Sequence, residues 1–240
     1  MKWSGLVGAL LSLMTATGCA TAVPAMVGGS TTPSNRTDLG VGGGARVPLG
    51  KLKNWDGAEP NFEPDASAGG VVPMVYGRYG LTDTWDLGLL VAGTMIRADF
   101  RREVLLQDGS TRSALVMGLA PYGGWVTTEG PETEGGRAGF EVPLTYGVEI
   151  GGLYEFWLGA RLSGEWVKGD FERNDVDGLE SGWGVRLGPV IGMALGVRRF
   201  HALVELTAAY EHWSIGDVNG GRLRRNGVAL IPGFALRLRL

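Results

Sequence analysis

The chain has 240 residues with a formal net charge of -3, and 20% of its residues are charged. Its 42 glycines are scattered along the chain and not clustered. This composition argues against a disordered protein and against nucleic acid as a partner, because nucleic-acid-binding domains are usually basic. Cys19 is the only cysteine, so the chain can form no internal disulfide. We expect one main domain.

The amino-terminal sequence MKWSGLVGALLSLMTATGCA is typical of a bacterial export signal. Lys2 precedes an apolar run from Leu6 to Met14, and small residues precede Cys19. The run is too short for a helix that spans a bilayer, which needs about 20 residues. We therefore expect a signal peptide at residues 1–18 and not an anchor helix.

The motif ATGC at residues 16–19 resembles the lipobox of bacterial lipoproteins, in which the cysteine is lipidated and becomes the new amino terminus. The resemblance implies lipidation of Cys19, and Ala20 after it is similar to lipoproteins sorted to the outer membrane. Ordinary cleavage after Ala20 or Ala22 is the alternative. Residues 19–37 are small, polar and rich in Gly and Pro, which predicts a flexible tether.

From residue 38 onwards apolar side chains alternate with small or charged ones, which is the period of a β-strand. In YGRYGLTDTWDLGLLVAG the alternation breaks at 81–84 and resumes at Trp85, so a tight turn joins two strands. The pattern predicts about ten strands, at 38–49, 69–80, 84–93, 95–107, 112–126, 139–151, 153–166, 182–197, 199–213 and 227–240.

The predicted connections alternate in length, except that the one near Gly93 is short where a long one is expected. Long polar loops fall at 50–68, 127–138, 167–181 and 214–226, and short turns fall at 81–83, 108–111, 151–152 and around Arg198. This asymmetry resembles bacterial outer-membrane barrels with both termini on the periplasmic side. No hydrophobic run after residue 19 reaches the length of a membrane-spanning helix, so any membrane crossing would have to be made by strands.

The two faces of the predicted strands differ in chemistry. One face is apolar and carries aromatic residues near the strand ends, as expected for a band in contact with lipid between two interfaces. The predicted aromatic girdle is Trp85, Trp125, Phe140, Tyr154, Trp166, Trp183 and Phe200.

The opposite face carries glycine, alanine and charged residues of both signs, which predicts a lumen filled by paired charges. The predicted lumen charges are Arg46, Arg78, Arg97, Asp99, Arg101, Glu103, Glu141, Glu149, Glu155, Arg161, Glu165, Arg186, Glu205, Arg237 and Arg239. Asp86, Arg198 and Glu211 fall on the same face.

A period of two does not say which face contacts water. A soluble calycin-like barrel with its apolar face inside would show the same alternation. The ten strands, the aromatic belts and a final strand that runs to Leu240 favour the membrane, and that strand, ALIPGFALRLRL, resembles the carboxy-terminal signal of outer-membrane barrel proteins. We therefore predict an all-β fold, an antiparallel up-and-down transmembrane β-barrel of about ten strands over residues 38–240.

Residues His212-Trp213-Ser214 resemble the outer-membrane lipid A deacylases, in which a histidine activates a serine for attack on an ester. The resemblance implies Ser214 as nucleophile and His212 as base. Ile215 and Gly216 depart from that family's pattern, and a strand end at the membrane interface is the alternative that we favour.

Two other features are weighed as metal or ligand sites. Residues 170–180 are acidic and could offer oxygen ligands to Ca²⁺, but Arg173 occupies the first ligand position of an EF-hand, which favours a solvated loop. His201 has no partner histidine or cysteine at ligand spacing and is interpreted as structural. We predict no metal site and no cofactor.

The resulting hypothesis is a barrel of the bacterial outer membrane, lipid-anchored at its amino terminus, with outer-membrane lipid and the barrel assembly machinery as partners. Its leading function is a structural or surface-interaction role, with an unknown surface ligand bound by the long loops. A narrow solute channel or transporter, a soluble lipid-anchored ligand-binding barrel and a lipid-modifying enzyme stay open as alternatives. We expect no enzymatic activity.

Overall fold

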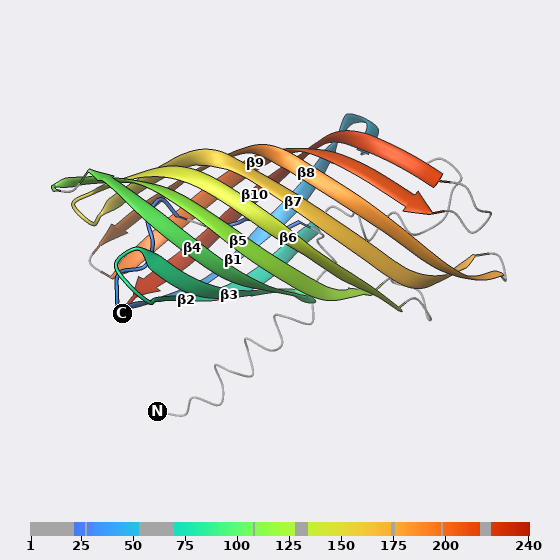
Figure 1. Ribbon diagram of the computed structural model, residues 1–240, viewed down its shortest axis with the longest axis horizontal. Coiled ribbons are helices and arrows are strands. Elements are labelled where there is room, and N and C mark those ends of the chain that lie inside the picture. Colours follow the sequence, from blue (N-terminus) through green and yellow to red (C-terminus); the bar gives the residue numbers. More distant parts are fainter. Residues whose placement is uncertain are drawn as a thin grey trace, which may run out of the picture.

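The structure is a computed structural model that describes residues 22–26, 28–52, 70–107, 109–127, 134–173, 176–197, 199–216 and 222–240. These residues form ten strands and one short 3-10 turn (Figure 1). The bounds are β1 (Thr37–Leu49), η1 (Gly50–Leu52), β2 (Gly70–Gly80), β3 (Trp85–Ala92), β4 (Met95–Gln107), β5 (Thr111–Thr127), β6 (Glu134–Ile150), β7 (Tyr154–Arg173), β8 (Val176–Val197), β9 (Phe200–Gly216) and β10 (Arg222–Arg239).

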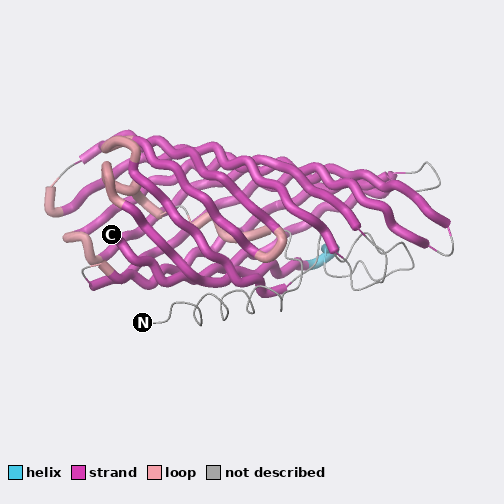
Figure 2. The backbone as a smooth tube through the Cα atoms, turned by 90° about the horizontal axis from the view of Figure 1, so that it is seen from below, coloured by secondary structure: helices cyan, strands magenta, loops and turns pink. Residues whose placement is uncertain are grey.

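Each strand pairs in antiparallel fashion with its neighbours in sequence, and β1 pairs with β10 to close a barrel. The predicted all-β, up-and-down barrel of ten strands is therefore confirmed. The closing register runs from Asp38 with Arg239 to Leu49 with Val228. Every strand therefore has a neighbour on both sides, and the barrel has no edge strand. The strands are tilted across the long axis of the barrel (Figure 2).

The hairpins β2–β3, β4–β5, β6–β7 and β8–β9 turn at one end of the barrel, here named the turn end, and the others turn at the loop end. In the β6–β7 turn, Gly151 and Gly152 have φ of 60° and 68°, which tight hairpin turns require and glycine adopts without strain. The amide of Leu240 donates to the carbonyl of Thr37 (2.8 Å), so both ends of the barrel domain lie at the turn end.

Several strands extend further than the sequence predicts. The predicted loop 167–181 is wrong, because β7 and β8 stay paired up to Arg173 with Val176. The predicted loops 127–138 and 214–226 are likewise shortened by pairs of Thr127 with Glu134 and of Gly216 with Arg222. Beyond a bilayer both faces of a two-stranded ribbon meet water, so strands continue there without the apolar alternation on which the prediction depends.

The exterior of the barrel is apolar. In β8 the exposure alternates strictly from Ser181 to Leu195, and the exposed side chains include Leu187, Ile191 and Met193. The remaining nine strands also have large apolar side chains exposed on their outer faces. The inverse arrangement, with the apolar face inside, is therefore not what the chain adopts.

All residues of the predicted aromatic girdle are exposed on this outer face. Trp85, Tyr154 and Phe200 begin β3, β7 and β9 at the turn end. Trp166 and Trp183 are cross-strand neighbours nearer the loop end. In the part of the chain that the structure describes, none of the helical segments has the length and apolarity that a bilayer crossing needs.

Candidate functional site

The interior of the barrel contains the charges that the strand parity predicts. All the predicted lumen charges are buried except Glu149 and Arg239, which are partly exposed near the turn end. Asp86 and Glu211 are also buried, whereas Arg198 lies outside the described residues. Buried charges are stable only when they are paired and hydrogen-bonded, so their partners decide what the lumen can do.

In the loop half of the lumen, two glutamates bridge three arginines. Glu211 pairs with Arg46 at 2.6 Å and with Arg186 at 3.4 Å between nitrogen and oxygen. Glu165 pairs with Arg186 at 2.7 Å and with Arg137 at 3.9 Å. The guanidinium of Arg186 also lies 4.9 Å from the centroid of the Trp213 ring, and the Trp213 indole donates to Glu211 (3.0 Å).

A second chain of ion pairs crosses the middle of the barrel. Glu141 pairs with Arg161, and with Arg97 at 3.8 Å. Asp99 then pairs with Arg97 at 3.0 Å and with Arg78 at 3.5 Å. Positive and negative groups therefore alternate across four strands, from β7 through β6 and β4 to β2.

The turn half of the lumen contains four further carboxylates with arginine partners, among them Glu149, which pairs with Arg239 at 3.1 Å. Asp86 pairs with Arg101, and Glu103 with Arg112 at 2.5 Å. Glu155 binds Arg237 at 2.6 Å and Arg239 at 3.0 Å. These carboxylates also accept hydrogen bonds from donors that do not belong to the strands.

The remaining partners come from residues 22–26 and 28–36, here named the luminal segment. Up to Thr32 the segment is buried inside the barrel except for the half-buried Ser30 (Figure 2), whereas Pro33, Asn35 and Arg36 are exposed at the turn end. At the turn end the segment joins β1, where the amide of Asn35 donates to the carbonyl of Gly80 (2.9 Å). At its other end Ala22 packs against Ala209 and Ile231. The expectation of a flexible tether is therefore not met over these residues.

The main-chain amides of the luminal segment bind the wall carboxylates. The amides of Ala25 and Met26 donate to Glu205 at 2.7 and 3.0 Å. In the turn half, the amide of Gly29 donates to Glu155 (2.5 Å), that of Thr31 to Glu103 (2.7 Å) and that of Thr32 to Asp86 (2.8 Å). Carboxylates of four different strands thus hold one stretch of backbone.

The carbonyl groups of the same stretch accept from wall arginines. Arg97 donates to the carbonyl of Ala25 (2.5 Å) and Arg78 to that of Met26 (2.5 Å). Arg161 donates to the carbonyl of Val23 (3.1 Å). The barrel therefore recognises both the donors and the acceptors of the segment's main chain.

Glycines of the barrel wall make room for the segment. Gly44 and Gly233 are cross-strand partners on β1 and β10, and a Cβ atom on either would lie 2.2 Å from the ring of Pro24. A Cβ atom on Gly147 of β6 would lie 2.0 Å from the carbonyl oxygen of Gly29. No real Cβ atom comes that close to another heavy atom, so these wall positions accept only glycine while the segment is bound.

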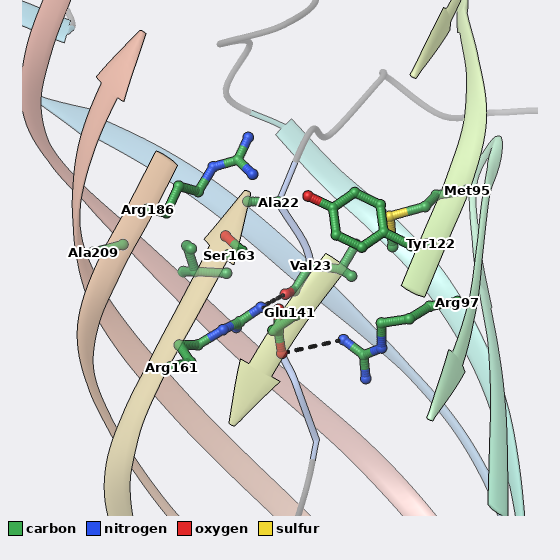
Figure 3. A pocket seen from close by; sticks show the side chains of 11 residues that line it. Ala22, Val23, Met95, Arg97, Tyr122, Glu141, Arg161, Ser163, Arg186 and Ala209 are labelled. Atoms are coloured by element: carbon green, nitrogen blue, oxygen red, sulfur yellow. Dashed lines mark hydrogen bonds and ion pairs between the residues drawn. The ribbon is translucent and has the colours of Figure 1, made fainter. Parts of the chain in front are cut away.

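A cavity lies beside the end of the luminal segment (Figure 3). Figure 3 shows Ala22 and Val23 facing Tyr122 and Glu141, with Arg161 close by. Its volume is about 20 Å³, which is room for about one water molecule.

Among the described residues, those of the deacylase resemblance do not form a triad. His212 lies on the outer face, where its ring is 5.4 Å from that of Trp183, and Ser214 is buried beside it. Glu211 lies on the inner face and binds Arg46. A triad needs a carboxylate that orients the histidine, and this neighbouring carboxylate is on the wrong side of the strand.

The Nε2 atom of His201 donates to the carbonyl of Gly152 (3.0 Å), which ties β9 to the β6–β7 turn. Of residues 170–180 the structure describes backbone in β7 and β8 but no side chains. Among the described residues, no group of three or more His, Cys, Asp or Glu side chains is placed to hold a metal ion.

Sequence reasoning missed two kinds of site residue. Arg137 was assigned to a loop, and Asp38 and Arg112 were not counted, although each continues the charged parity of its strand. The luminal segment had no such signal, because its hydrogen bonds to the wall are made mostly by its backbone, which leaves no pattern of residue types.

The chain matches no protein-family model and no curated protein sequence. Solved structures of bacterial outer-membrane β-barrel proteins do resemble it in fold. They include the outer membrane protease OmpT of Escherichia coli (11% identity, 88% of this chain and 98% of that one, TM-score 0.45).

Neisserial surface protein A (15% identity, 85% and 95%, TM-score 0.31) and the attachment invasion locus protein Ail of Yersinia pestis (10% identity, 86% and 99%, TM-score 0.31) are also similar. At these identities and TM-scores the similarity is no evidence for any particular function.

Proposed function

We propose that the chain is an integral β-barrel of the bacterial outer membrane, with a closed lumen and a structural or surface-contact role. The observation that carries this proposal is the reversed polarity of the barrel. Large apolar side chains are exposed on the outside of every strand, while buried ion pairs occupy the inside. Monomers in water rarely expose apolar patches beyond a few hundred Å², so a band around a whole barrel requires lipid.

The closed lumen favours contact over transport. Ion pairs and the luminal segment fill the interior, and the described cavity holds about one water molecule. The contact surface would then be the loop end, where the β7–β8 hairpin reaches furthest (Figure 1). A non-enzymatic role is part of the proposal, as are outer-membrane lipid, the barrel assembly machinery and a surface ligand as partners.

The position of Ala22 bears on the predicted lipid anchor, although Cys19 itself lies outside the described residues. Ala22 packs on Ala209 of β9, and Ala209 follows Phe200 at the turn end by nine residues. In a tilted strand, nine residues place Ala209 about 20 Å from the turn end along the barrel axis. Three residues link Cys19 to Ala22 and reach about 10 Å at most. Cys19 therefore cannot carry an acyl chain in the inner leaflet while the luminal segment is bound in the barrel. The bound segment favours the alternative, which is cleavage after Ala20.

The proposal is tested on outer membranes of cells that express the chain. We expect the protein to resist extraction by carbonate and to migrate faster on an SDS gel before boiling than after it, because a closed barrel resists SDS until it is heated. Release by carbonate without a shift in migration would contradict the proposal.

A further inference from the structure

The luminal segment occupies a place in the barrel that is shaped for one bent stretch of polypeptide, in which Met26 and Gly28 have left-handed φ of 46° and 68°. We propose that the lumen is a binding site for the main chain of one such peptide, with this chain's own luminal segment as the resident occupant. Removal of the occupant opens a polar path, and a peptide added in trans can fill it. The consequence for conduction rests on the proposed membrane barrel, whereas peptide binding can be measured without it.

Glu205 is the strongest single argument. Its carboxylate is buried and, among the described residues, accepts from the amides of Ala25 and Met26 and from the indole of Trp157 (3.2 Å). The structure gives this carboxylate no arginine within 4 Å in the described part of the chain, unlike the other predicted lumen carboxylates. Two of its three hydrogen bonds thus exist only while a peptide backbone is present.

The second argument is that the contacts are made mostly with backbone. Five amides of the segment reach wall carboxylates, and carbonyls from Val23 to Ser30 reach wall arginines. Inside the barrel, side-chain hydrogen bonds are added at Ser30, Thr31 and Thr32. The side chains of Val23, Ala25 and Met26 pack in the buried apolar cluster of the wall. A site of this kind selects mainly for the course of the backbone, with apolar side chains at a few positions.

The third argument is the set of wall glycines. Gly44 and Gly233 form a notch for one proline ring, and Gly147 lets the backbone of Gly29 touch the wall. Three strands therefore lack side chains where the peptide passes. An interior evolved only for ion pairs would have no need of space at these positions.

Conduction of the empty lumen is the first test. Two variants are inserted into planar bilayers: one lacks residues 22–33 and the other carries Gly147→Ala. Both are first confirmed as folded by the heat-dependent shift in their migration on an SDS gel. Because alanine at 147 cannot coexist with the bound segment, we expect ion conductance at least about tenfold above that of the intact chain from both variants. The matched control is Gly77→Ala on the outer face of β2, whose Cβ would make only ordinary contact with Leu39 (3.4 Å) and should stay closed.

Binding in trans is the second test, with the synthetic peptide TAVPAMVGGSTTP, which copies residues 21–33. We expect it to block the deletion variant and to change the fluorescence of Trp157 in detergent micelles, where no membrane is needed. The same peptide N-methylated at the positions of Ala25 and Gly29 lacks one of the two amide donors to Glu205 and the amide donor to Glu155. It should bind at least about tenfold more weakly, since each hydrogen bond to a charged group is worth about a factor of ten.

A folded deletion variant that stays closed, or a peptide that binds no better than its N-methylated form, would overturn the inference. If the deletion variant does not fold, Gly147→Ala carries the conductance test. Failure of the intact chain to insert into bilayers, together with tight peptide binding in micelles, would contradict the membrane proposal and leave the peptide site standing.

Discussion

At the scale of single residues, the lumen is a set of buried charges whose stability depends on complete pairing. Asp86 illustrates this, because it binds Arg101 from the neighbouring strand and the amide of Thr32 from the luminal segment. The strand parity of the sequence predicts such charges correctly wherever a strand is recognised. It does not predict their partners, since cross-strand register and a segment without periodicity decide which charges meet.

We predict that Asp86→Ala lowers the free energy of unfolding by about 3–5 kcal/mol, because it leaves the Arg101 guanidinium buried without its carboxylate. The control is Asp83→Ala in the adjacent exposed turn, where a change within about 0.5 kcal/mol is expected. Urea unfolding in lipid vesicles measures both. Equal effects of the two substitutions would show that the lumen pair adds no stability.

At the scale of the strands, the outer faces are the most predictable part of the molecule. A side chain against lipid must be apolar, so the alternation in β8 from Val185 to Leu195 marks the strand directly. The prediction fails where that requirement ends. The continuation of β7 to Arg173 and of β8 back to Val176 has no apolar face, and the sequence alone reads as a loop.

The lipid face of β8 gives a prediction that depends on depth. Ile191 is 44% exposed in the middle part of β8, and Ile191→Arg should cost about 2–4 kcal/mol in a bilayer. The control Ser181→Arg is exposed near the loop end of the same strand and should cost about 0–1 kcal/mol. Unfolding in vesicles tests this, and two small, equal costs would mean that β8 does not face lipid.

At the scale of the whole molecule, a closed barrel, an apolar exterior and an interior filled by the chain's own amino-terminal residues form one arrangement. The number of strands follows from the alternation that is repeated along the chain, and the aromatic belts indicate which face is the outer one. The occupant of the lumen does not follow from the sequence, because residues 22–26 and 28–36 have the composition of a linker and are held by groups contributed by distant strands.

The central claim is that the apolar face contacts lipid and the charged face does not. Trp157 and Leu158 are adjacent residues of β7 on opposite faces, the first fully buried and the second 50% exposed. Two proteins with one tryptophan each are compared in vesicles of lipids brominated on their acyl chains, one keeping Trp157 and the other carrying Trp157→Phe with Leu158→Trp. In both, every other tryptophan is replaced by phenylalanine.

The account predicts strong quenching of the tryptophan at position 158 and little quenching of Trp157, because bromine quenches only by contact. Quenching of Trp157 with an unaffected tryptophan at 158, or no quenching of either, would contradict it.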